Sequence, residues 1–106
     1  MKRGDFVTVA LQGDYGKPRP ALIVQSDLLA ELGSVIVCPV TSELRDVAFR
    51  VLVEPTPGTG LQVASQVMVD KLATVPRAKL GPAFGRLDED RMKAVERTLL
   101  LVLGMA

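Results

Sequence analysis

The sequence predicts a mostly β protein with one C-terminal α-helix, folded as a small, mainly antiparallel barrel or half-barrel with the helix packed on it. Short apolar segments recur along most of the chain, and glycines and prolines separate them at hairpin-like distances. Only the last segment, residues 88–104, has helical periodicity. The length of 106 residues fits one domain, residues 1–106.

The first half of the chain contains three predicted strands. Residues 6–11 are apolar on both faces apart from Thr8, which is typical of a central strand. Residues 21–25 and 34–39 are the second and third strands, and Pro39 is expected to end the third because it lacks an N–H for the ladder.

The connections and the second half give shorter signals. Residues 26–27, Ser-Asp, are suited to cap a short helix before the third strand. Residues 49–54 alternate with period two over part of their length and predict a strand. After the proline- and glycine-rich turn 55–60, residues 61–64 and 66–70 are further strand candidates.

The C-terminal helix is the clearest element. Asp88 is a good N-cap, and two acidic residues follow it in the first turn, where they favour the helix dipole. Leu87 and Met92 are spaced for a hydrophobic staple, and Gly104 is expected to end the helix. Residues 99–103 are apolar all round, so we expect a partner to cover the side that the core does not use.

Composition excludes several classes of protein. One cysteine and no histidine argue against a disulfide framework or a zinc site. A net charge of +1 is not that of a general nucleic-acid coat protein. No apolar signal or membrane-spanning stretch is visible, which favours a cytoplasmic protein. A mean hydropathy of +0.29 is high for a small monomer and favours a subunit interface.

Arg19 is the first candidate for function. It stands in Lys17-Pro18-Arg19-Pro20, directly before the apolar residues 21–24. The two prolines restrict the backbone on both sides, so the guanidinium is presented from a stiff segment that suits a fixed anion. The alternative is an ordinary surface ion pair.

Other polar residues have a turn or cap as their competing interpretation. Thr41 and Ser42 follow the third strand and could bind a phosphate oxygen or orient a nucleophile beside Arg19. Asp70 ends a later strand candidate and could hold Arg19 or a ribose hydroxyl. Asp14 and Tyr15 lie on the glycine-containing loop before Arg19.

The remaining cations form no run in the sequence. Folding could still gather several of them beside Arg19 as contacts to a single-stranded nucleic acid. We predict this role for Lys17, Arg45, Lys71 and Arg77.

The order and spacing of these segments resemble the MazF/PemK family of toxins from type II toxin–antitoxin modules. The segments that carry the resemblance are Arg3-Gly4-Asp5 before an apolar strand, residues 19–25, residues 35–42, Gly60-Leu61, Ser65 to Asp70 followed by Thr74-Val75, and Gly85-Arg86-Leu87 before a helix that ends Leu103-Gly104.

This resemblance implies an SH3-like barrel of the CcdB/PemK type, a homodimer, and a sequence-specific endoribonuclease, or mRNA interferase, that works without metal or cofactor. The family cleaves single-stranded mRNA by attack of the ribose 2′-hydroxyl on the adjacent phosphate, which leaves a cyclic phosphate and a 5′-hydroxyl and inhibits translation. The family's Arg-Pro arginine falls on Arg19 and its threonine on Thr41. An acidic antitoxin is the implied partner.

The resemblance leaves the general acid and base open. Some members carry a histidine or glutamate in the loop before the arginine, where this chain has Asp14 and Tyr15. Some carry an arginine two residues before the aspartate that aligns with Asp70, where this chain has Met68.

Two alternatives belong to other functional classes. One is a non-enzymatic poison of DNA gyrase, like the CcdB toxins, which bind through a tryptophan at the end of the helix. This chain has no tryptophan and ends Leu103-Gly104-Met105-Ala106. The other is an inactive barrel that only binds protein, against which the Arg19–Thr41 pair argues.

Overall fold

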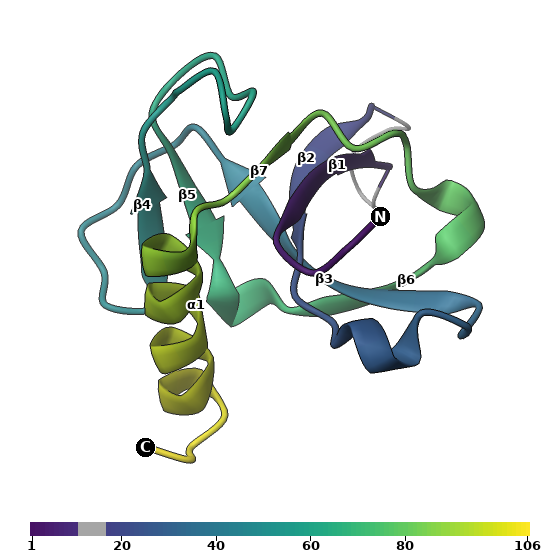
Figure 1. Cartoon of the computed structure of the whole chain (residues 1–106). Helices are drawn as coiled ribbons and strands as arrows, with labels where there is room; N and C mark the ends of the chain where they lie inside the picture. The colour runs from purple at the N-terminus through teal and green to yellow at the C-terminus, as the bar shows by residue number, and fades with distance from the viewer. Residues whose placement is uncertain (11–16) are drawn as a thin grey trace.

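The computed structural model describes residues 1–10 and 17–106, in which seven strands form one curled antiparallel sheet with a helix beside it (Figure 1). The strands are β1 (Asp5–Val9), β2 (Arg19–Ile23), β3 (Ser34–Thr41), β4 (Arg50–Val53), β5 (Ser65–Met68), β6 (Ala73–Pro76) and β7 (Gly85–Arg86). The helix is α1 (Glu89–Val102), and three short 3₁₀ turns are η1 (Asp27–Leu29), η2 (Val69–Lys71) and η3 (Arg77–Lys79). The mostly β half-barrel with one C-terminal helix is the predicted fold class.

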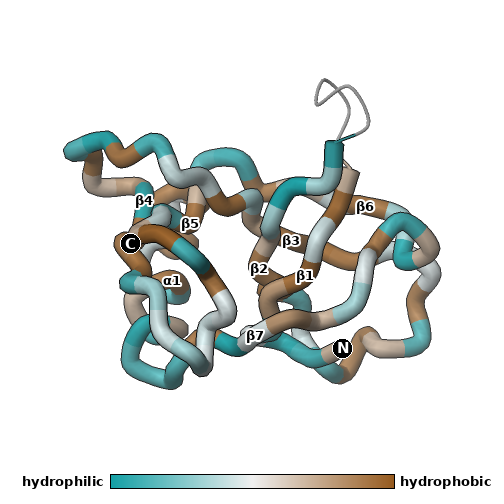
Figure 2. The backbone as a smooth tube through the Cα atoms, turned by 90° about the horizontal axis from the view of Figure 1, so that it is seen from above, coloured by the Kyte–Doolittle hydropathy of each residue, from teal (hydrophilic) through white to brown (hydrophobic). Residues whose placement is uncertain are grey.

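The long strand β3 joins the two parts of the sheet. The strand order is β4-β5-β3-β2-β1-β7, and β6 pairs with β3 off this path. Residues 34–37 of β3 pair with β6, whereas residues 40–41 pair with β5. β5 and β6 thus pair with the same edge of β3 toward its two ends, and β2 pairs with the other edge. Figures 1 and 2 show β4, β5 and α1 toward one end of β3 and β6 toward the other.

The change of partner along β3 explains why Pro39 does not end the strand. Between the β6 and β5 pairings, Cys38 and Pro39 pair only with β2. A proline is tolerated where a ladder is interrupted, because its missing N–H then leaves no partner unsatisfied on that side. The strand therefore continues to Thr41, and the prediction that it ends at Pro39 was wrong.

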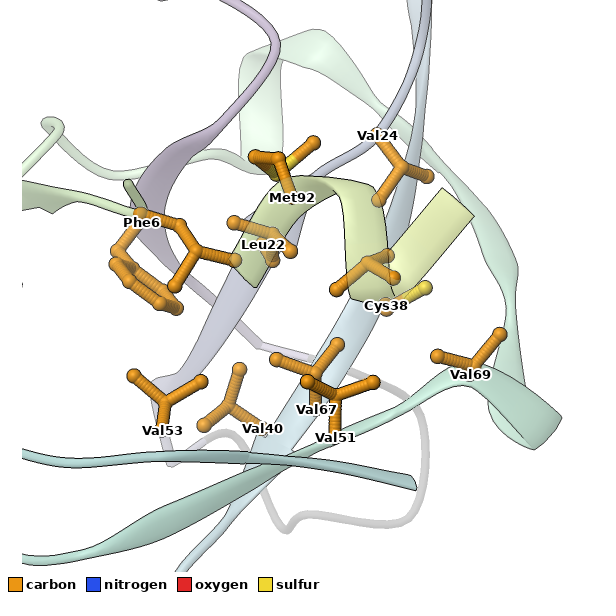
Figure 3. Close-up of a cluster of buried hydrophobic side chains, with 12 residues drawn as sticks. Phe6, Leu22, Val24, Cys38, Val40, Val51, Val53, Val67, Val69 and Met92 are labelled. Atoms are coloured by element: carbon orange, nitrogen blue, oxygen red, sulfur yellow. The ribbon is translucent and has the colours of Figure 1, made fainter. Parts of the chain in front are cut away.

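Alternation along β1 builds two hydrophobic clusters on opposite faces of the sheet. Phe6 lies in the cluster that packs against Met92 and Val95 of α1, part of which Figure 3 shows. Val7 and Val9 lie in the cluster on the other face. Both faces of β1 are thus buried, and β2 and β7 pair with its two edges. This confirms the predicted central strand, over Asp5–Val9 in place of residues 6–11. Along the tube in Figure 2, hydrophobic residues concentrate in the strands and hydrophilic ones in the loops.

The helix begins and ends as the sequence predicts. The Asp88 side chain accepts a hydrogen bond from the Arg91 N–H at 2.8 Å. At the other end Gly104 has a φ of 75°, and the N–H groups of Met105 and Gly104 bond the carbonyls of Leu100 and Leu101 at 2.7 and 3.1 Å. This is a Schellman ending, which satisfies two of the last carbonyls. The helix has 14 residues, and no helix in the described part of the chain is long and apolar enough to cross a bilayer.

Short elements differ most from prediction. Residues 61–64 are not a strand, and the candidate at 66–70 is a strand over Ser65–Met68 followed by the turn η2. The helix expected after residue 26 is only the three-residue η1, capped by the Ser26 side chain. Strands β6 and β7 were not predicted, because each is short and depends on partners far along the chain.

Candidate active site

Arg19 and Thr41 lie at the same end of two neighbouring strands. Arg19 is the first residue of β2, where it pairs with Val9 of β1 and its side chain is exposed. Strands β2 and β3 are antiparallel, with Ala21 opposite Pro39. Carried two residues further, the same register sets Arg19 opposite Thr41, the last residue of β3. The two prolines beside Arg19 stiffen this end of the pair.

A cavity of about 690 Å³ opens at this end. Arg19 and Pro20 line it from β2, and residues 39–43 line it from β3 and the loop that follows. Residues 61–63 line it from the segment before β5. Ser65, Met68 and Lys71 complete the lining. The lining combines hydroxyls and two cations with apolar side chains, which is the composition expected of a ligand site.

The hydroxyl of Thr41 has one fixed partner. Its Oγ1 accepts a hydrogen bond from the Glu43 N–H at 3.0 Å. A hydroxyl that accepts in this way still carries a hydrogen that it can donate. The Glu43 carboxylate in turn accepts a hydrogen bond from Arg45 Nη2 at 2.8 Å. Hydrogen bonds therefore connect Thr41 to Glu43 and Glu43 to Arg45 within the loop after β3.

A second cation, Lys71, is placed by an ion-pair network. Arg50 Nε lies 3.3 Å from Asp70 Oδ1, and Lys71 Nζ lies 3.7 Å from Asp70 Oδ2. The side chains of Arg50 and Asp70 are largely buried, whereas that of Lys71 is exposed to the cavity. Asp70 therefore anchors cations beside the site and does not itself line it.

The part of the chain that the structure describes offers neither a thiol nucleophile nor a clustered metal site. Burial, with a smaller contribution from the negative charge of Asp70, raises the pKa of Cys38 from 9.0 to about 12, so the thiol stays protonated at neutral pH. Among the described residues, no group of three or more His, Cys, Asp or Glu side chains is placed to hold a metal ion.

The arrangement is suited to an anion with several oxygens. Arg19 presents a planar fork of donors, Thr41 and Ser42 present hydroxyls, and Lys71 adds a point charge. Charge-assisted hydrogen bonds of this kind favour phosphate, and more strongly a phosphate that gains negative charge during reaction.

Comparison with known proteins decides the family. Residues 2–103 match the model of the family described as PemK-like, MazF-like toxin of type II toxin-antitoxin system. The chain belongs to this family.

Relatives of the toxin agree with this assignment. It is 47% identical over 108 residues to a protein of Mycolicibacterium smegmatis named probable endoribonuclease MazF, and the match covers 100% of this chain and 99% of that one. Its fold matches the Mycobacterium tuberculosis toxin MazF-mt6 with a TM-score of 0.85 and 26% identity, over 96% of this chain and 98% of that chain. It also matches a mycobacterial endoribonuclease in complex with its cognate antitoxin, with a TM-score of 0.86 and 20% identity, over 100% and 97% of the two chains.

The structure brings four of the predicted residues of the toxin together: Arg19, Thr41, Ser42 and Lys71 all line the cavity. The other predicted residues that the structure describes are not among its lining residues. Lys17 is exposed two residues before Arg19, and Arg45 lies in the loop after β3. Asp14 and Tyr15 lie outside the described residues.

Arg77 lies at the other end of β3 from the cavity. It follows β6, whose last residue pairs with Ser34, the first residue of β3. Its Nε donates to the Leu32 carbonyl at 2.9 Å. Eight strand residues separate the two ends by about 23 Å at ~3.3 Å per residue. We therefore leave Arg77 out of the proposed RNA interface.

Sequence reasoning missed three features of the site: Glu43, residues 61–63 and Gln66. Glu43 and residues 61–63 line the cavity but belong to loops without a motif, so nothing in the sequence marks them. Gln66 was missed as well, because its side chain hydrogen-bonds the backbone of Arg45, which belongs to another segment of the chain.

Proposed function

We propose that this toxin is a sequence-specific endoribonuclease that cleaves single-stranded mRNA at the cavity between Arg19 and Thr41. The observation that carries the proposal is that Arg19 and Thr41 line one cavity from the adjacent ends of two paired strands. The family and the named relative support the same activity. Residues 1–106 act as one domain, and the proposed place of action is the cytoplasm, where cleavage stops translation.

The proposed reaction is an internal phosphoryl transfer. The ribose 2′-oxygen attacks the adjacent phosphorus, and the bond from phosphorus to the 5′-oxygen breaks. A proton leaves the 2′-hydroxyl and another reaches the 5′-oxygen, so the products carry a 2′,3′-cyclic phosphate and a 5′-hydroxyl. No water is added in this step. The protein therefore has only to orient the 2′-hydroxyl and the phosphate, transfer protons and stabilise negative charge.

Each side chain has a role in this scheme. Arg19 binds two oxygens of the five-coordinate phosphorus, whose extra charge strengthens both hydrogen bonds in the transition state. Thr41 donates its hydroxyl hydrogen to the same group or holds the 2′-hydroxyl in line. Lys71 in the cavity lining, with the exposed Lys17 and Arg45 outside that lining, contacts the flanking phosphates. Residues 61–63 offer an amide and apolar side chains to an unstacked base.

Two partners complete the proposal. An acidic segment of the cognate antitoxin covers the cavity, where its carboxylates bind Arg19 and Lys71 in place of phosphate. A second copy of the toxin covers the end of α1, where the structure exposes five apolar side chains in the last turns: Leu100, Leu101, Val102, Leu103 and Met105. A cluster of this kind on one exposed segment is typical of an interface.

The activity is tested with purified toxin, a long unstructured RNA and excess EDTA, and primer extension maps the ends. We expect cuts at one short sequence, with 5′-hydroxyl ends that polynucleotide kinase can phosphorylate directly. Absence of cuts by the folded protein, cuts that require added magnesium, or 5′-phosphate ends would contradict the proposal.

The dimer is tested by sedimentation velocity. Leu101→Glu places a charge in the apolar cluster and is expected to shift the toxin from dimer to monomer. Leu28→Glu is the matched control, because Leu28 is 93% exposed on η1 and does not belong to this apolar cluster. Identical sedimentation of the two variants would remove the assignment of this interface.

A further inference from the structure

A buried glutamine on β5 holds the loop that follows β3. Gln66 is only 8% exposed, and in the sheet it lies opposite Thr41 of β3 and Leu52 of β4. Its Oε1 accepts from the Arg45 N–H at 3.0 Å, and its Nε2 donates to the Arg45 carbonyl at 2.7 Å. The side-chain amide thus pairs with both backbone groups of one loop residue, as a neighbouring strand would.

These two bonds belong to a series of contacts that reaches the Thr41 hydroxyl. The Arg45 side chain binds the Glu43 carboxylate, and the Glu43 N–H binds Thr41 Oγ1. Thr41 and Gln66 are themselves paired across β3 and β5. The loop has no regular secondary structure of its own, so its position depends on these contacts.

We infer that Gln66 is a positioning residue for RNA cleavage: it fixes the loop that carries Ser42 and Glu43 and thereby sets the direction of the Thr41 hydroxyl. The inference rests on the proposed function. Gln66 does not line the cavity, so it acts through the loop and not on the RNA. A hydroxyl held in place before substrate arrives needs no reorganisation in the transition state, so loosening it lowers turnover more than binding.

The molecule contains a matched control for this inference. Gln25 is 7% exposed and also binds backbone groups with both ends of its amide, but at the opposite end of β3. Its Nε2 donates to the carbonyls of Leu29 and Ser34 at 3.3 and 3.4 Å, and its Oε1 accepts from the Ile36 N–H at 3.3 Å. Gln25→Leu and Gln66→Leu therefore both remove a buried amide clamp, and only the second loosens the cavity loop.

The test measures kcat and KM of both variants on a short RNA that contains the mapped cleavage sequence. We expect Gln66→Leu to lower kcat by about 10- to 100-fold, the range expected for a displaced catalytic contact, with little change in KM. Gln25→Leu should retain wild-type kcat per folded molecule. If Gln66→Leu does not fold, Gln66→Glu replaces it, because a carboxylate keeps the acceptor for the Arg45 N–H and loses the donor to the Arg45 carbonyl. A kcat for the Gln66 variant within twofold of wild type, or equal losses in both variants, would overturn the inference.

A second measurement does not depend on activity. Amide hydrogen exchange in the RNA-free protein should be slow at Arg45 in the wild type and in Gln25→Leu, and fast in Gln66→Leu. If the wild type does not cleave RNA, the proposed function fails while this experiment still reports whether Gln66 fixes the loop. Unchanged exchange at Arg45 in Gln66→Leu would overturn the inference even in an active enzyme.

Discussion

The two ends of the β2–β3 pair use the same devices to hold their backbone. At the turn end, the buried amide of Gln25 and the hydroxyl of Ser26 bind neighbouring backbone groups. At the cavity end, the buried amide of Gln66 and the hydroxyl of Thr41 do the same. Hydrogen bonding from side chain to backbone therefore does not by itself distinguish the functional end.

What differs is the surface that each end presents. The turn end exposes Leu28, Leu29 and Leu32 and has a cavity of about 10 Å³, room for roughly one water molecule. The cavity end presents Arg19 and Lys71 around about 690 Å³. The functional end is distinguished by two cations and a hydrogen-bond-donating hydroxyl that line the same cavity. Each of these groups can be removed by a single substitution.

The largest effect is expected at Arg19, and the arginine of the turn end, Arg77, is its control. Arg19→Ala should lower RNA cleavage by about 10²- to 10³-fold, the loss typical of one donor to a developing anion. Arg77→Ala, at the turn end, should leave cleavage unchanged, because Arg77 binds the Leu32 carbonyl far from the cavity. Rates are measured on the mapped RNA, with circular dichroism as the check on folding. Equal losses in both variants would mean that RNA also contacts the turn end.

The hydroxyls give the next contrast. Thr41→Val keeps the shape of the side chain and removes its donor. A hydrogen bond to a charged group is worth about 1.5–3 kcal/mol, so we expect cleavage to fall about 10- to 100-fold. Thr41→Ser should recover most of the rate. Ser26→Ala removes the corresponding hydroxyl at the turn end and should alter stability without altering cleavage; a slower Ser26→Ala enzyme would show that the two ends are coupled.

The sequence could predict the two strands beside Arg19 and Thr41, because apolar runs bounded by prolines and polar residues are local signals. It placed both residues just outside those strands, whereas Arg19 begins β2 and Thr41 ends β3. It could not predict which loop would lie across from them. Residues 61–63 reach the cavity without forming the predicted strand, and β6 depends on a register with β3 that no local pattern encodes. Gln66 has no sequence signal at all, since a glutamine on a strand is marked as a clamp only by the segment that folds against it.

Cys38 lies on β3 between the two ends, and the pKa of its thiol measures how well the sheet there excludes water. Burial raises the pKa of its thiol to about 12 in the folded state, against 9.0 for an ordinary thiol. As the pH rises, the thiol of the unfolded chain therefore loses its proton before the thiol of the folded protein does. The stabilisation of the folded state by the buried thiol is complete below pH 9 and is lost as the pH rises toward 12. The slope is about 1.4 kcal/mol per pH unit in this window.

Urea unfolding of wild type and Cys38→Ala at several alkaline pH values tests this directly. The difference in unfolding free energy between the two proteins should shrink as the pH rises above 9, and stay constant below it. A difference that is independent of pH up to 11 would mean that the thiol is open to solvent, and that the sheet between the two ends is looser than its burial indicates.

The smallest effect is expected at Lys71, which separates binding from chemistry within the cavity end. Its side chain is largely exposed, and Asp70 holds it at 3.7 Å while Arg50 remains as that carboxylate's other partner. Lys71→Ala should therefore raise KM by about threefold, with kcat nearly unchanged, as expected for a phosphate contact worth under about 1 kcal/mol in water.

The salt dependence of RNA binding decides whether that contact is made. Each phosphate neutralised on a single strand contributes about −0.7 to the slope of log affinity against log salt, so Lys71→Ala should reduce the slope by about that amount. A matched loss in Lys93→Ala, on α1 and outside this cavity, would show a general charge effect and not a contact. A loss confined to Lys71→Ala would place a phosphate of the RNA backbone at Lys71, in the same cavity that Arg19 lines.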